Sequence, residues 1–187
     1  QNPFALFRVS NTSITTPVKT LDSFIDTTTE IDSAKFILTF NEDSITTDMI
    51  FDLFYFPGDG DSIFNESESN YLNLTENDLI HGVFISSSTL SQQEPDDSLS
   101  TSSYPTLSFD IAHIFSAFLD TSNENRNRTV MVKPQSNLTE VIAFKSSESG
   151  FTFAPQIKVF SHDTAFVDST GDSVVSAISH TFISTDD

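Results

Sequence analysis

The fold is decided by the stretch from Ser108 to Phe160, which opens with SFDIAHIFSAFLD at positions 108–120. In this opening segment apolar residues recur at spacings of three and four, which places them on one face of an α-helix. Asp110 precedes that face and can accept a hydrogen bond from a free N–H of the first helical turn. The spacing therefore predicts a helix over about 109–120, with an apolar face formed by Ile111, Ile114, Phe115, Phe118 and Leu119.

The segments around this helix predict β-strands. After it come TVMV at 129–132, VIAFK at 141–145 and FTFAPQIKVF at 151–160, and before it ALFRV at 5–9 and AKFILTF at 34–40. Residues 48–56 are apolar at nearly every position, which is typical of a strand covered on both faces. The serine-rich segment 86–103 is predicted to be a long surface loop. The predicted fold is mainly β, a jelly-roll-like β-sandwich with one packed α-helix.

The order of these motifs resembles the DNRLRE family of extracellular β-sandwich modules, which are related to the TGF-β propeptide-like fold and to one class of carbohydrate-binding modules. The motifs that carry the resemblance are ALFRVS (5–10), IDSAKFIL (31–38), the helix motif at 109–119, VMVK (130–133), FKSSES (144–149) and PQIKV (155–159). The resemblance implies an extracellular β-sandwich, and its best-known activity is carbohydrate binding. Tyrosine rings on which a sugar could stack are limited to Tyr55, Tyr71 and Tyr104.

The chain is strongly acidic. It holds 8 basic and 27 acidic residues, which gives a formal net charge of −19. Like charges repel, so we expect neither nucleic acid nor anionic lipid as a partner. No run approaches the roughly 18 apolar residues that span a bilayer, so we expect no membrane insertion. The chain begins at Gln1 without a methionine, and we expect a processed protein located outside the cell or on its surface.

Motifs with a catalytic meaning are missing from the sequence, and we expect a protein that is not an enzyme and needs no cofactor. Calcium is the one alternative, with Asp59 and Asp61 as candidate ligands in the turn PGDGD. Four histidines, His81, His113, His162 and His180, share no spacing typical of zinc sites. Asn-x-Ser/Thr sequons, which are candidate glycosylation sites, begin at Asn65, Asn73, Asn127, Asn11 and Asn137.

The C-terminal residues 161–187 carry strand motifs that the family places first. We therefore divide the chain into a sandwich domain, residues 1–160, and a C-terminal strand segment, residues 161–187. Three arrangements fit this order: the segment folds back in its own chain, it is donated to a neighbour, or the chain is one unit of a tandem array. A strand that packs on its own chain through Phe166 and Phe182 would remove the main support for donation.

The hypothesis from the sequence is a structural subunit of an extracellular filament or surface layer, in which copies associate head to tail by strand donation or tandem linkage. Its partners are then other copies of the chain. The alternative is a carbohydrate-binding module, whose partners are glycans. The residues predicted to form the assembly interface are Ala165, Phe166, Val167, Phe182, Ile183, Phe4 and Leu6.

Overall fold

The computed structural model describes most strands of the chain but not all of its connections. The described residues are 4–9, 13–15, 24, 29–41, 45–56, 81–91, 104–115, 128–136, 142–146, 148, 150, 152–163 and 177–186. They contain the strands β1 (Ala5–Val9), β2 (Thr29–Thr39), β3 (Met49–Tyr55), β4 (Val83–Leu90), β5 (Thr106–Asp110), β6 (Arg128–Pro134), β7 (Gln156–Asp163) and β8 (Ala177–Asp186), and the short 3-10 helix η3 (Ala112–Ile114).

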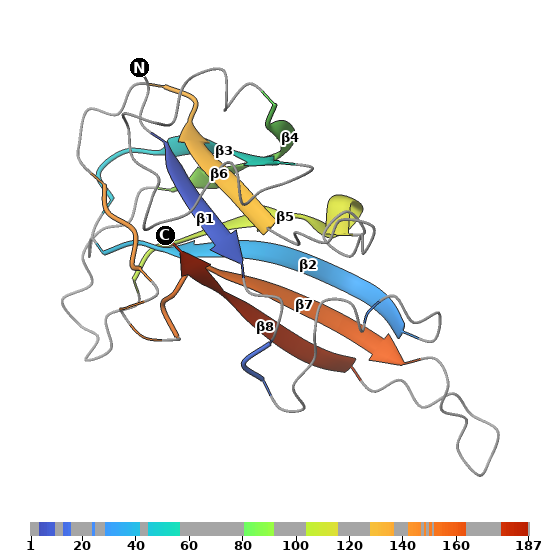
Figure 1. Ribbon diagram of the computed structural model, residues 1–187. Helices are drawn as coiled ribbons and strands as arrows, with labels where there is room; N and C mark the ends of the chain where they lie inside the picture. The colour runs from blue at the N-terminus through green and yellow to red at the C-terminus, as the bar shows by residue number, and fades with distance from the viewer. Residues whose placement is uncertain are drawn as a thin grey trace, which may run out of the picture.

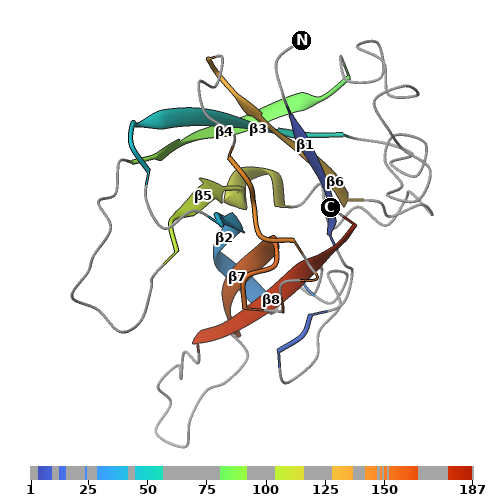
Figure 2. The same ribbon diagram turned by 90° about the vertical axis from the view of Figure 1, so that its left-hand side faces the viewer.

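The eight strands follow one another in the order β4-β3-β6-β1-β8-β7-β2-β5, and all neighbours are antiparallel. The first four strands form one layer, sheet A, and the last four form a second layer, sheet C (Figures 1 and 2). The layers are joined where β1 meets β8, through the register pairs Arg8 with Asp186 and Val9 with Ser184. This architecture confirms the predicted mainly-β sandwich.

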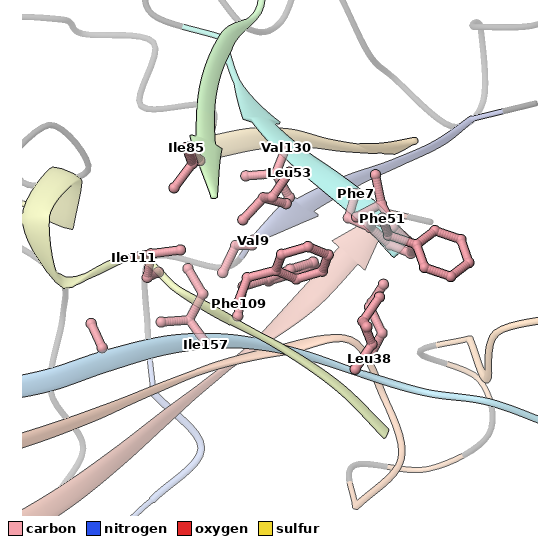
Figure 3. Packing of buried hydrophobic residues seen from close by; sticks show 14 of the residues in the cluster. Phe7, Val9, Leu38, Phe51, Leu53, Ile85, Phe109, Ile111, Val130 and Ile157 are labelled. Atoms are coloured by element: carbon pink, nitrogen blue, oxygen red, sulfur yellow. The ribbon is translucent and has the colours of Figure 1, made fainter. Parts of the chain in front are cut away.

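The core lies between the two sheets. Alternate residues of each strand point inward, because successive side chains of a strand face opposite sides. In Figure 3, side chains of sheet A such as Phe7 and Leu53 approach side chains of sheet C such as Leu38, Phe109 and Ile157. In the predicted strand at 34–40 the alternate residues Phe36, Leu38 and Phe40 share one face, and all three are fully buried.

The predicted helix over 109–120 begins later than expected. Phe109 lies in β5, the 3-10 turn Ala112–Ile114 follows, and Phe115 is α-helical. The reason is a competing period of two, because Leu107, Phe109 and Ile111 alternate with polar residues and are all buried. Asp110 does accept the expected hydrogen bond, from the backbone N–H of Ala112 at 2.9 Å. Residues 116–120 lie outside the described residues.

Two further strand predictions need correction. The segment predicted as a loop from residue 86 begins as strand, because Val83–Leu90 forms β4. The serines and the threonine of β4 alternate between inner and outer positions of the sheet. Because all of them are polar, the sequence shows no alternation of polar and apolar residues there. In the run 141–145, the described residues 142–145 form an isolated bridge, between Phe40 and Phe144. The strands at 5–9 and 129–132 are confirmed within β1 and β6, and the run 151–160 is confirmed only from Gln156, where β7 begins.

The C-terminal strand β8 occupies a central position. It pairs with β7 along most of its length and with β1 at its end. Phe182 is fully buried in the core cluster, at 6.2 Å from the ring of Phe24. His180 is also fully buried and its ring lies 5.5 Å from that of Phe24. Residues 177–186 therefore fold back into their own chain, which is the first of the three arrangements considered above.

Candidate functional site: the outer faces of the sandwich

The structure separates the residues that the sequence predicts for an assembly interface. Phe182 is in the core, and Ile183 is the next residue of the same central strand. Phe4 and Leu6 belong instead to a second apolar cluster, together with Phe54, Phe56 and Met131. Ala165, Phe166 and Val167 lie outside the described residues. Donation of β8 to a neighbour loses its main support, because Phe182 already packs in its own chain.

Several other predicted sites cannot be placed. The sequons at Asn11, Asn65, Asn73, Asn127 and Asn137, the calcium candidates Asp59 and Asp61, and Tyr71 all lie outside the described residues. Among the residues that are described, no group of three histidines or carboxylates is arranged to hold a metal ion. The calcium hypothesis thus stays a prediction.

The two tyrosines that are described do not present a free ring. Tyr104 packs edge-on against Phe153, with ring centroids 5.4 Å apart. The ammonium of Lys145 covers the Tyr104 ring at 3.8 Å from its centroid, in a cation–π contact. Tyr55 is half-buried and packs against the core. A sugar that stacks on either ring would have to displace these contacts.

The outer face of sheet A carries a row of apolar side chains that crosses four strands. Leu6 on β1 is the register partner of Met131 on β6, Met131 of Phe54 on β3, and Phe54 of Phe84 on β4. Leu6 and Met131 are buried, whereas Phe84 at the other end of the row is 54% exposed. We call Val83 and Phe84 the β4 patch, since both are exposed and lie at the edge of the sheet.

A bulge in β4 creates this patch. Ser86 is the register partner of Leu53, but Phe84 is the partner of Phe54, so Ile85 is an extra residue between them. The extra residue shifts the alternation and sends Ile85 into the core while Phe84 packs on the outer face against Phe54, with ring centroids 5.8 Å apart. Next to the row, Asp52 accepts hydrogen bonds on Oδ1 from Ser87 Oγ and Gln135 Nε2 at 2.6 and 2.8 Å.

The outer face of sheet C is different, because its central row is charged. Lys35 on β2 lies between Asp110 on β5 and Lys158 on β7, and Lys158 faces Thr181 on β8. In the adjoining row Phe160 lies between Ser33 and Ser179, and its ring is 41% exposed. We call Lys35, Lys158 and Phe160 the lysine surface.

A histidine bordered by two carboxylates lies at the far end of this face. His162 Nδ1 is 2.8 Å from Asp32 Oδ1, and His162 Nε2 is 3.4 Å from Glu30 Oε2. A second bulge places Asp32 there, since Ile31 and Ser33 pair with consecutive residues of β7. The imidazole ring lies between the two carboxylates, with Nδ1 facing Asp32 and Nε2 facing Glu30. The three side chains therefore do not converge on one point as metal ligands would.

Phenylalanine has no polar group, so most of the 19 phenylalanines of the chain are expected in the core, and this expectation does not single out the two that are exposed. The sequence does indicate that Phe160 faces outward, because it falls on the same side of the strand as the polar residues Gln156 and Lys158. Phe84 has no such signal, because the bulge that turns it outward depends on the pairing of β4 with β3.

Over the described ranges, no helix has the length and apolar character needed to cross a membrane. Comparison of the chain with family models, with curated proteins and with solved structures finds no match in any of the three.

Proposed function

We propose that this chain is a structural module of an extracellular filament or surface layer whose copies associate head to tail. The observation that carries the proposal is the β4 patch. β4 is a terminal strand of the sheet order, so one of its edges has no strand partner in that order. Edge strands of soluble proteins are usually protected by charged residues or proline, and Val83–Leu90 contains neither.

The position of β8 changes the form that the assembly takes. Because residues 177–186 are paired in their own chain, the neighbour is not completed by this strand. The proposal is instead that a second copy covers exposed apolar surface around Val83 and Phe84, whose exposed fractions are 50% and 54%. Burial of such surface contributes about 25 cal/mol per Å² before the costs of association are subtracted.

The extracellular location and the relation to DNRLRE-type modules belong to this proposal as well. Their support is the order of sequence motifs, the β-sandwich architecture and the strongly acidic composition. A net charge of −19 suits surroundings rich in salt or divalent cations, where screening reduces the repulsion between copies.

The test is self-association of the whole chain, followed by sedimentation velocity and by electron microscopy of negatively stained samples. We expect the native chain to form oligomers or filaments and Phe84→Ser to remain monomeric. Ile14→Ser is the matched control, because it removes an apolar side chain of similar exposure, 43%, from a segment beside β8. A native chain that stays monomeric at high concentration, with and without added salt and calcium, contradicts the proposal.

Carbohydrate binding is the second candidate function. The observation in its favour is the exposed ring of Phe160, which lies between the hydroxyl-bearing residues Ser33 and Ser179. The contacts of Tyr104 and Tyr55 weigh against it. Retention on neutral and acidic polysaccharide columns, with and without calcium, tests it. Retention that Phe160→Ala abolishes would favour this candidate, and no retention on any column would remove it.

A further inference from the structure

The lysine surface contains an unfavourable arrangement. Lys35 and Lys158 lie directly opposite each other on neighbouring strands, and like charges in such positions destabilise a sheet. On the outer face of sheet C, the ion pairs recorded among the described residues are both made by His162, with Asp32 and Glu30. Lys35 has Asp110 as its register neighbour on the other side, whereas Lys158 lies between Lys35 and Thr181. An anionic group that approaches this face from outside would compensate the ammonium group of Lys158.

The composition of the chain restricts where two copies can meet. With 27 acidic and only 8 basic residues, two copies repel each other over most pairs of surfaces. Contact is electrostatically favourable only where the local charge is reversed, and two of the 8 basic residues lie together on this face. Beside them Phe160 offers exposed apolar area that a partner can cover.

We propose that the lysine surface of one copy docks on the β4 patch of a second copy, an inference that rests on the proposed function. The two surfaces are complementary in apolar contact and in charge. Each has one exposed phenylalanine ring, Phe160 on β7 and Phe84 on β4. The β4 patch lies near Asp52, and both recorded hydrogen bonds to that carboxylate end on Oδ1. Its Oδ2 can therefore accept a charge-assisted bond from Lys158.

The placement of the two surfaces determines the kind of assembly. Phe84 of the β4 patch and the lysine surface lie on the outer faces of opposite sheets, and the outer faces of a sandwich point in opposite directions (Figure 2). A contact between two different surfaces of the same chain is heterologous. The stack always presents a free lysine surface at one end and a free β4 patch at the other. The stack therefore grows into a filament unless its rotation happens to close a ring.

Complementation between two defective variants tests this pairing. Phe84→Ser removes the β4 patch but leaves the lysine surface, and Lys158→Glu does the reverse. Each variant alone should sediment as a monomer, with its self-dissociation constant raised at least about tenfold, as expected when a close interfacial charge pair is lost. An equimolar mixture should contain a heterodimer that grows no further, because each partner has one intact surface.

Lys145→Glu is the matched control. It makes the same change of net charge as Lys158→Glu, but outside both surfaces, beside the bridge between Phe40 and Phe144, where Lys145 covers the Tyr104 ring. We expect it to assemble like the native chain. If both lysine variants weaken assembly equally, added repulsion is the cause and the docking inference is wrong, while the proposed function stands.

The remaining outcomes are equally decisive. Defective variants that fail to combine in the mixture show that the two surfaces are not halves of one interface. A Lys158→Glu variant that assembles normally but loses binding to a polyuronate column assigns the lysine surface to an acidic glycan instead. A native chain that remains monomeric overturns this inference and the proposed function together.

Discussion

β8 and β4 are both strands with many serines and threonines, yet they have opposite roles in the sandwich. β8, with the sequence AISHTFISTD, lies between β7 and β1 and buries His180, Thr181 and Phe182. β4, with the sequence VFISSSTL, lies at the end of the strand order and exposes Val83 and Phe84. The more polar of the two strands is the more central one.

The difference shows that position in a sheet depends on pairing partners rather than on the apolar content of a strand. β8 buries the rings of His180 and Phe182, and β7 along most of its length and β1 at its end pair with its backbone. β4 pairs with β3 alone in the strand order, and its bulge sends Ile85 into the core and Phe84 to the outer face. The substitutions below test this contrast, in order of decreasing expected effect.

Phe182→Ala should have the largest effect on stability. The ring is fully buried and contacts Phe24, so its removal leaves a cavity in the core. We expect the free energy of unfolding to fall by about 3–5 kcal/mol, measured by urea denaturation. A loss below about 1 kcal/mol would mean that β8 is not a permanent part of its own sandwich, and would revive the donation of this strand to a neighbour.

Ile85→Ala tests the one residue by which the bulge of β4 reaches the core. Ile85 is buried and belongs to the main core cluster. We expect a loss of about 2–3 kcal/mol in the same denaturation experiment. An effect as small as that of Phe84→Ser would contradict the division of β4 into an inward and an outward apolar residue.

Ser86→Ala should have a smaller effect. The Ser86 Oγ donates a hydrogen bond of 3.1 Å to the carbonyl oxygen of Asp110, which links β4 to β5 at the ends of the strand order. Removal of one such exposed bond costs about 0.5–1 kcal/mol. The thermal midpoint should fall slightly. Thr89→Ala is a suitable control, because it leaves this bond intact. Ser87→Gly is unsuitable, because it removes the hydrogen bond from Ser87 to Asp52. Equal melting of the Ser86 and Thr89 variants would show that the bond does not fasten β4.

Phe84→Ser should have the smallest effect on folding. Its ring is more than half exposed, and exposed substitutions away from special features usually change stability by no more than about 0.5 kcal/mol. The denaturation curve should nearly coincide with that of the native chain, while assembly is lost. A loss of more than about 2 kcal/mol would indicate that Phe84 serves folding, and would weaken its assignment to an interface.

The sequence predicts those parts of the fold whose signal is local. The alternation of Phe36, Leu38 and Phe40 predicts both a strand and its inner face, and the structure confirms both. The predicted start of the helix at residue 109 is wrong because the period of two at 107–111 overlaps the period of 3.6 that begins at Ile111. Local spacing cannot decide between them, since the outcome depends on the pairing of β5 with β2.

The candidate surfaces could be predicted only in part. The alternation of β7 places Lys158 and Phe160 on the same face, so half of the lysine surface is readable from sequence. That Lys35 lies opposite Lys158 follows from the register of β2 with β7, which is fixed by long-range pairing and by the bulge at Asp32. The β4 patch depends on a second bulge, and no local pattern signals it.

The junction between β1 and β8 has a consequence for the time course of folding. Arg8 and Asp186 are register partners although 178 positions separate them in the sequence, since 186 − 8 = 178. Contacts of such long range are formed late, because the entropy of closing the intervening chain must be overcome first. During synthesis, the two layers can be joined at this junction only after residues 177–186 have left the ribosome. Until then β1 and β7 each lack a neighbour, and the growing chain presents two unpaired edges to the copies around it.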